Sequence, residues 1–237
     1  MAADIAGERR APWVLLSPSL ATVGLLLIIP MLFIVVYSFW LRTATGADQV
    51  GFYLDNWIEV LGDRFYRDIL FQTFAIAFYT TVICAFVGYI PAYFVANTPM
   101  KSKAFLLLML MLPFWIMILN VYVSLDGIDK NLTEAAQSLG CTGWQAFREV
   151  TLPLSMPGLA AGSLLCFVLA AGTYITPIVL GGPRDAMFAN LVFEAIVTQL
   201  NWPLGSALSL VLLALLGVLV VIYTRYLGVD QIAKSFK

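Results

Sequence analysis

The chain has 237 residues, of which 61% are hydrophobic and 11% are charged, and its formal net charge is −1. Soluble domains contain about 45–50% apolar and about 25% charged residues, so this composition indicates a membrane protein. The near-neutral charge gives no electrostatic basis for nucleic-acid binding, and the absence of histidine removes the commonest general base and metal ligand. The cysteines fit neither a metal site nor a disulfide framework, and we interpret all three as small apolar residues: Cys84, Cys141 and Cys166.

Five apolar runs are long enough to cross a bilayer, which takes about 20 residues for roughly 30 Å of hydrocarbon. The first run is too long for a signal peptide, and we expect it to be retained as a membrane span. The predicted fold class is all-α, a polytopic helical membrane protein in which residues 1–237 form a single transmembrane domain. In chain order, we place the spans at about 14–39, 70–96, 104–124, 157–180 and 206–226.

Lysines and arginines that flank a span favour the cytoplasmic side, so their positions bear on the orientation of the spans. Five crossings cannot place all the basic flanks on one side, and charge alone does not decide between an inside and an outside N-terminus. Either the third span is re-entrant, or one crossing is absent near Asn120–Ser124. The basic flanks precede the first span, separate the second from the third and follow the fifth: Arg9 and Arg10, Lys101 and Lys103, and Arg225, Lys234 and Lys237.

A polar stretch at about 126–153 separates the third span from the fourth, and its first part predicts a short amphipathic helix. Asp129 is expected to cap the start of this helix, and Gly140 is expected to end it in a left-handed conformation. The apolar residues recur at helical spacing and share one face of the helix: Ile128, Leu132, Ala135, Ala136 and Leu139.

A second short helix is predicted to follow the glycine turn. Thr142 and Gln145 match a capping box, in which each side chain bonds to the backbone N–H of the other residue. Pro153 is expected to stop this helix, because proline disfavours helical geometry in the residue before it. The sequence therefore predicts a helix, a tight turn, a second helix and then the fourth span.

Two interpretations of this helix pair compete. It could be an amphipathic connector that lies at the lipid headgroups. However, Ala135 and Ala136 offer little apolar area to a membrane, whereas small residues allow close approach to another protein. The second interpretation, a helix that docks in a groove of a partner protein, therefore fits better.

The residues of this stretch resemble a known signature. Glu134-Ala135-Ala136, Gly140, Val150 and Leu152-Pro153 stand at the spacing of the EAA motif of ABC importer permeases, which usually has Ile in place of Val150. In that family, the motif forms the coupling loop that seats in a groove of the cytoplasmic ATPase subunit. The resemblance implies the ABC importer type I permease fold and the same role for this loop.

Other segments resemble successive blocks of the spermidine/putrescine-type permeases, from about Leu16 to Arg225. One departure concerns the number of spans, which is usually six in that family. There, an external segment and a further span follow the LPFW block, whereas here MLPFWIMILN runs directly into VYVSLDGIDKNLTEAA. One crossing is therefore expected to be missing near Asn120–Val121. The positions of the basic flanks also point to an absent crossing in this region. The matching blocks are LSPSLATVGLLLIIPMLFIVVYSFW, GYIPAYFVAN, MLPFWIMILN, TPIVLGGP and NWPLGSALSL.

The resemblance implies the permease subunit of a binding-protein-dependent importer in the bacterial inner membrane, with a cytoplasmic N-terminus. Its solute would be small and charged: a polyamine such as spermidine or putrescine, or an opine or aminoethylphosphonate. The implied partners are a cytoplasmic ATPase dimer, a second permease that is more often a homologue than a copy, a periplasmic or lipoprotein solute-binding protein, and membrane lipid. The chain has no GxxxxGK[ST] loop, so ATP and Mg are expected on the ATPase, and no enzyme activity, cofactor, metal or catalytic residue is expected here.

The resemblance also assigns the coupling residues. Glu134 would make a polar contact with the ATPase, small side chains would allow close packing, and a glycine would set the turn. A Leu-Pro pair would fix the junction with the fourth span. The complete set is Glu134, Ala135, Ala136, Gly140, Leu152 and Pro153.

Candidates for the solute pathway lie further along the chain. Thr173, Tyr174 and Thr176 belong to the fourth span, beside a glycine and a proline that could loosen it. Glu194 and Trp202 precede the fifth span, and an acid with an aromatic ring suits a cationic amine. The alternatives are an interfacial anchor for Trp202 and an ordinary solvated carboxylate for Glu194.

Other functional classes fit less well. An ion-coupled secondary transporter would carry an ionisable group within a span, and the interiors of the five spans contain none. A membrane enzyme would need a constellation of carboxylates, nucleophile and base, or metal ligands, and none is recognisable. A non-transporting scaffold or a channel subunit is the alternative, and co-purification of an ATPase subunit would distinguish it from a permease.

Overall fold

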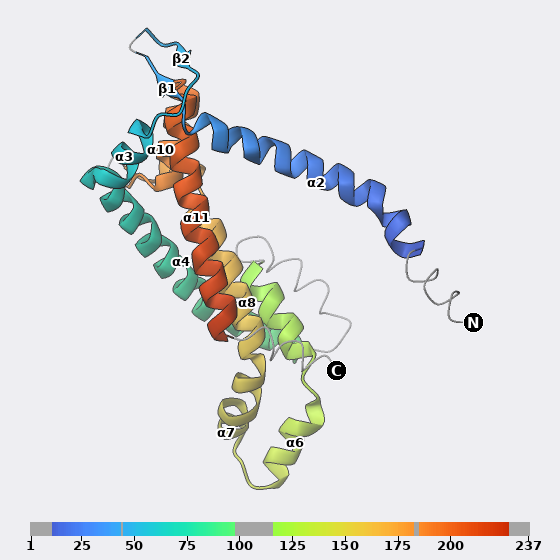
Figure 1. Ribbon diagram of the computed structural model, residues 1–237. Coiled ribbons are helices and arrows are strands. Elements are labelled where there is room, and N and C mark those ends of the chain that lie inside the picture. Colours follow the sequence, from blue (N-terminus) through green and yellow to red (C-terminus); the bar gives the residue numbers. More distant parts are fainter. Residues whose placement is uncertain (1–10, 44, 98–115, 183–184, 228–237) are drawn as a thin grey trace. The chain divides into compact units, whose positions relative to one another are not determined.

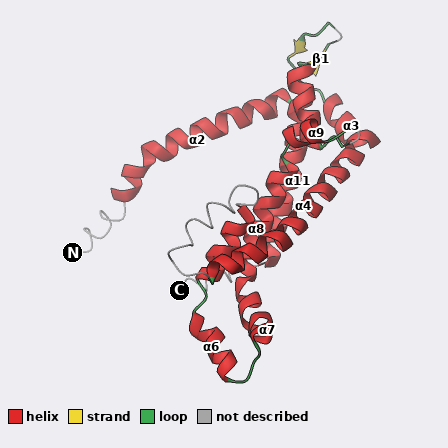
Figure 2. Cartoon of the chain, turned by 180° about the vertical axis from the view of Figure 1, so that it is seen from behind, coloured by secondary structure: helices red, strands yellow, loops and turns green. Residues whose placement is uncertain are grey.

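The computed structural model describes residues 11–43, 45–97, 116–182 and 185–227, and most of them are helical, which confirms the all-α prediction (Figures 1 and 2). The helices η1 and η2 are π-helical turns. In chain order the elements are α2 (Ala11–Tyr37), β1 (Leu41–Arg42), β2 (Asp48–Gln49), α3 (Asp55–Gly62), α4 (Arg64–Ala96), the helix Ile116–Asp126, α6 (Lys130–Ser138), α7 (Gly143–Ala146), η1 (Phe147–Thr151), α8 (Leu152–Ala171), α9 (Ile175–Leu180), α10 (Phe188–Phe193), η2 (Glu194–Thr198) and α11 (Trp202–Leu227).

Four helices in the described part of the chain are long and apolar enough to cross a membrane: Ser17–Tyr37, Arg64–Ala96, Gly143–Ala171 and Trp202–Arg225. They correspond to the first, second, fourth and fifth predicted spans. The first part of the third predicted span, at about 104–115, lies outside the described residues. So do most of the basic flanking residues: Arg9, Arg10, Lys101, Lys103, Lys234 and Lys237.

The described part of the third predicted span forms the apolar helix Ile116–Asp126. Asn120 and Val121, where one crossing was expected to be missing, lie within this continuous helix. The backbone is therefore continuous at the point where the missing crossing was expected.

The fourth predicted span ends earlier than the sequence indicated. α8 ends at Ala171, and the chain then leaves helical geometry before α9 begins at Ile175. Pro177 lies in the first turn of α9, where its missing N–H is tolerated. In a continuous helix the same proline would leave a carbonyl of the preceding turn without a donor, so the interruption accommodates it.

The described residues pack as two compact units, one within Met1–Arg64 and Leu191–Val211, and the other within Phe65–Asn190 and Leu212–Lys237. The first unit contains the antiparallel pair β1–β2, in which Leu41 is opposite Gln49. Its connecting loops are held by polar contacts, since the side-chain amide of Asn56 donates to the carbonyl of Trp40 at 2.8 Å.

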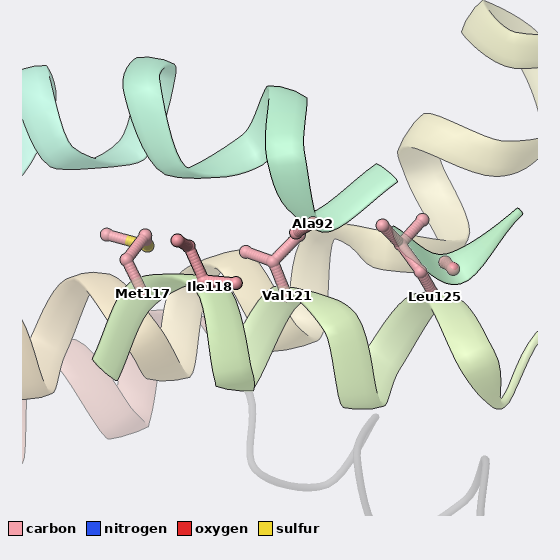
Figure 3. Close-up of a cluster of buried hydrophobic side chains, with 6 residues drawn as sticks. Ala92, Met117, Ile118, Val121 and Leu125 are labelled. Atoms are coloured by element: carbon pink, nitrogen blue, oxygen red, sulfur yellow. The ribbon is translucent and has the colours of Figure 1, made fainter. Parts of the chain in front are cut away.

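The second unit has its core where the helix Ile116–Asp126 packs against the end of α4 (Figure 3). Val121 and Ala92 are completely buried in this contact. On α8, Gly158 allows the helix Ile116–Asp126 to approach closely, because a Cβ at this glycine would overlap Ser124 and the Asn120 carbonyl. The cluster consists of Ala92, Ala96, Met117, Ile118, Val121 and Leu125.

Candidate functional site

The polar stretch forms two short helices, α6 and α7, that lie side by side beyond the start of α8 (Figures 1 and 2). Asp129 caps α6 as predicted, since its carboxylate accepts a hydrogen bond from the N–H of Asn131 at 3.0 Å. Gly140 has a φ of 96°, which confirms the predicted glycine turn. Residues that carry a Cβ rarely adopt a positive φ, whereas glycine does so readily. The N–H of Cys141 closes the turn by bonding to the carbonyl of Ala136 at 3.1 Å.

The start of α7 also follows the prediction. The N–H of Gln145 donates to the Thr142 hydroxyl at 3.3 Å, and the N–H of Thr142 donates to the Gln145 side chain at 2.8 Å. This reciprocal capping box satisfies two backbone donors that the helix itself leaves free. Local sequence is therefore sufficient to define both ends of the turn.

The prediction that Pro153 stops the second helix is wrong. α7 continues through the π-helical turn η1 into α8, and Gly143–Ala171 forms one helical stretch. The N–H of Leu152 bonds to the carbonyl of Phe147, five residues back, so the wider turn shifts the hydrogen-bond register just before the proline. Pro153 then occupies the first turn of α8, where a missing N–H is tolerated.

The helix pair presents large apolar side chains to the surroundings. Leu139 is 88% exposed and Trp144 is 70% exposed, while Leu132 is about half exposed. Glu134 and Ala135 are also exposed, whereas Ala136 is half-buried. Exposed apolar groups of this size on an otherwise polar helix pair are typical of a surface that a partner covers.

Glu134 faces the rest of the second unit across a small cavity of about 200 Å³. The cavity lies between α6 and the ends of α4 and of the helix Ile116–Asp126. Glu134 therefore borders both the open surface of α6 and the base of the membrane-spanning helices. The lining residues are Tyr93, Ala96, Asn97, Leu125, Asp126, Ile128, Thr133, Glu134 and Thr151.

Phe147 links the helix pair to α4 through aromatic contacts that the sequence analysis missed. Its ring meets Tyr93 edge-on at a centroid distance of 5.1 Å and Tyr89 at 6.0 Å, and it stacks on Trp144 at 5.4 Å. Edge-to-face geometry of this kind is favourable for aromatic pairs. The spacing of four residues places the two tyrosines on one face of α4, which is the only sequence signal for this contact.

Thr173 and Thr176, two of the predicted solute-pathway residues, border one cavity of about 560 Å³. Their hydroxyl oxygens lie 3.4 Å apart. Thr80 of α4 and Asp185 also line this cavity, and neither was identified from the sequence. Tyr174 is not among the lining residues, and its carbonyl instead accepts a hydrogen bond from the side chain of Asn190 at 2.7 Å.

Glu194 and Trp202 belong to the other unit of the chain. Glu194 is exposed at the start of η2, where it accepts a hydrogen bond from Gln199 at 3.4 Å. Trp202 begins α11, is half exposed and borders a separate cavity of about 640 Å³ together with residues of α2. The structure therefore brings Thr173 and Thr176 together at one cavity, whereas Glu194 and Trp202 belong to the other unit and are not among its lining residues.

The described part of the chain has the long apolar helices of a polytopic membrane protein, and one of them, α8, is continuous with the short helix α7. This is the fold of ABC importer permeases. A crystal structure of a bacterial ABC transporter involved in the import of the acidic polysaccharide alginate contains the same fold, with a TM-score of 0.71 and 13% identity over 94% of this chain and 97% of that chain. The alginate ABC transporter in complex with alginate pentasaccharide-bound periplasmic protein matches with a TM-score of 0.68, over 92% of this chain and 94% of that chain.

Residues 17–232 match the family of binding-protein-dependent transport system inner membrane components, and the chain belongs to this family. It is therefore a multi-pass inner-membrane permease component of an importer and not an enzyme.

Relatives agree with the resemblance to spermidine/putrescine-type permeases. The spermidine/putrescine transport system permease protein PotB of Salmonella typhimurium is 27% identical over 254 residues, which cover 85% of this chain and 88% of the relative. The PotB of Escherichia coli K12 is 26% identical and is covered to 92%. The inner membrane ABC transporter permease protein YdcU of Escherichia coli K12 is 35% identical over 132 residues, which cover 56% of this chain and 41% of the relative.

The alignments with PotB extend over 254 positions, whereas this chain has 237 residues. The PotB relatives therefore contain residues that have no counterpart in this chain.

Proposed function

We propose that this chain forms part of the pathway for a small polyamine, such as spermidine or putrescine, in an importer driven by a separate ATPase. The observation that carries the proposal is the continuity of α7 with α8, which joins an exposed docking element directly to a membrane-spanning helix. The names of the PotB relatives support the choice of solute. Opines and aminoethylphosphonate are the competing solutes.

The helix pair α6–α7 docks on the cytoplasmic ATPase in this proposal. Glu134 makes a polar contact with the ATPase, and Ala135 and Ala136 allow its surface to approach closely. Gly140 sets the angle between the helices, and the junction Leu152-Pro153 carries the movement of α7 into α8. The exposed side chains of α6 and α7 are available for such a contact.

ATP and Mg are held by a dimer of the ATPase, and closure of that dimer displaces the docked helix pairs. Because α7 and α8 form one helical stretch, the displacement reaches the cavity beside Thr173 and Thr176, which opens alternately to the two sides. A solute-binding protein delivers the polyamine from the periplasmic side. A second permease, a homologue of this chain, completes the pathway, and the N-terminus and the helix pair face the cytoplasm.

Two substitutions test the coupling role in the assembled complex. Glu134→Lys reverses a charge at the proposed contact, and Gly140→Asp puts a side chain where the backbone has a φ of 96°. Each should abolish transport and the ATPase activity stimulated by the binding protein, while the chain still inserts into the membrane. Gly143→Ala is the matched control, because a methyl group there meets open space. Unchanged coupling in the first two variants would overturn the proposal.

The solute is tested on the cognate binding protein, by measuring its thermal stability with polyamines, opines and phosphonates. A ligand that binds only the folded state raises the melting temperature. Stabilisation by polyamines alone supports the proposed solute. A non-transporting scaffold or channel subunit, the second candidate, would purify without an ATPase subunit.

A further inference from the structure

The cavity beside Thr173 lies where a membrane-spanning helix is interrupted. α8 ends at Ala171 and α9 begins at Ile175, and side chains from both helices border the cavity. Interrupted membrane helices are suited to binding polar solutes, because their ends present backbone dipoles within the membrane.

The end of α8 contributes negative partial charge to this cavity. Leu169, Ala170 and Thr173 all line it, so the C-terminus of the helix borders the open space. The last turn of α8 contains no basic residue that would neutralise the helix dipole. A helix C-terminus carries about half a negative charge and favours cations within one turn of its end.

Asp185 adds a full negative charge to the same cavity. One carboxylate oxygen, Oδ2, accepts a hydrogen bond from the N–H of Gly182 at 2.7 Å, and the backbone N–H of Asp185 bonds to the Gly182 carbonyl at 2.9 Å. These bonds hold the carboxylate in place. Within the described parts of the chain, its other oxygen has no hydrogen-bond partner.

Three hydroxyl groups complete the polar side of the cavity, those of Thr80, Thr173 and Thr176. Hydroxyl oxygens and carboxylates are hydrogen-bond acceptors, which an ammonium group requires because it has three donors and no acceptor. The remaining lining side chains are mainly apolar. The apolar side consists of Ile76, Ile116, Cys166, Leu169, Ala170, Pro177, Leu180 and Met187.

We propose that Asp185, the three threonine hydroxyls and the C-terminus of α8 form a site for a primary ammonium group of the transported solute. The inference rests on the proposed function, and it selects among the three candidate solute classes. A polyamine presents only cationic ends to the site. An opine or a phosphonate brings an anionic group that the carboxylate and the helix C-terminus repel. The volume of about 560 Å³ accommodates a small aliphatic amine.

The test uses the assembled transporter in proteoliposomes with its binding protein, and it measures spermidine moved per ATP hydrolysed. Asp185→Asn removes the charge but keeps an oxygen that can accept the Gly182 N–H, so the loop is retained. We expect the ratio of spermidine moved to ATP hydrolysed to fall by roughly tenfold, because the ammonium group loses its charged partner. Asp185→Glu should retain several times more transport than Asp185→Asn. ATPase activity stimulated by the loaded binding protein should stay within about twofold of wild type, because the coupling helices are unchanged.

Asp55→Asn is the matched control, since it neutralises an exposed carboxylate in the first turn of α3. It should transport spermidine as the wild type does. Thr173→Val provides a second variant that keeps the loop intact, and it should lower the ratio by a few-fold. An unchanged ratio in Asp185→Asn and Thr173→Val would overturn the site while the proposed function stands. A wild-type complex that moves no polyamine would overturn the proposed solute together with the site.

Discussion

The hydroxyl oxygen of Tyr89 on α4 lies 2.7 Å from the hydroxyl oxygen of Ser155 on α8. Ser155 is completely buried, and its hydroxyl also lies 2.9 Å from the Leu152 carbonyl. The contact joins the two long helices just beyond the π-helical turn that leads from α7 into α8. The helical stretch Gly143–Ala171 is thus connected to α4 by a hydrogen bond from α8 as well as by the ring of Phe147.

Removing this hydrogen bond should weaken the transfer of movement to α4. Tyr89→Phe keeps the aromatic contact with Phe147 but deletes the hydroxyl, and Ser155 retains its bond to the Leu152 carbonyl. The loss of stability should therefore be only about 1 kcal/mol. We expect the complex to assemble and the ratio of solute moved to ATP hydrolysed to fall, as measured in proteoliposomes.

Tyr79→Phe is the control for this variant, since Tyr79 lies on the same helix and is 66% exposed. Its ratio should equal that of the wild type. Equal ratios for both variants would show that the hydrogen bond has no part in coupling.

The turn between α6 and α7 should tolerate substitution at one glycine and not at the other. Gly140 has a φ of 96°, whereas Gly143 lies in the first turn of α7, and a Cβ at either position meets open space. Gly140→Ala should destabilise the turn by about 1–2 kcal/mol, and Gly143→Ala should be neutral or slightly stabilising. The measurement is the rate of limited proteolysis between the two helices. Identical rates for both variants would contradict the backbone explanation.

The capping box should stabilise α7 measurably. Thr142→Ala removes the hydroxyl that accepts the N–H of Gln145, and such losses cost about 1 kcal/mol. Amide hydrogen exchange should become faster in the first turn of α7. Ser138→Ala is the control, because the Ser138 hydroxyl only bonds back to the Glu134 carbonyl within α6. Faster exchange in both variants, or in neither, would contradict the prediction.

Close packing between α8 and the helix Ile116–Asp126 should depend on Gly158. A methyl group there overlaps Ser124 and the Asn120 carbonyl, so Gly158→Ala should lower the free energy of unfolding by about 1–3 kcal/mol. Gly217→Ala on α11 adds the same methyl group to open space and should not destabilise the chain. Thermal unfolding in detergent compares the two, and a lower melting temperature for Gly217→Ala than for Gly158→Ala would contradict this packing.

Short-range features of this protein could be predicted from its sequence. The four long apolar helices follow from runs of apolar residues, because each helix satisfies its backbone hydrogen bonds internally. Asp129, Gly140 and the pair Thr142–Gln145 act on backbone groups within three residues of themselves, so their roles are encoded locally. Thr173 and Thr176 were selected by the same local reasoning, as polar residues beside a glycine and a proline, and their role in the solute pathway stays a prediction.

Features that depend on hydrogen-bond register and on distant neighbours required the tertiary structure. Proline alone indicates the end of a helix. In the structure, the π-helical turn η1 precedes Pro153, and the helix continues past this proline. No local pattern in the sequence predicts such a turn. Tyr89 and Ser155 are far apart in the sequence, and no local pattern pairs them. In the sequence, Asp185 resembles any loop carboxylate, and only the fold shows that it borders the same cavity as the end of α8. The sequence by itself thus determined the membrane-spanning helices and the polar helical element formed by α6 and α7. The tertiary structure decided how that element connects to the helices and which charged group borders the cavity, because both depend on contacts between residues that the chain separates.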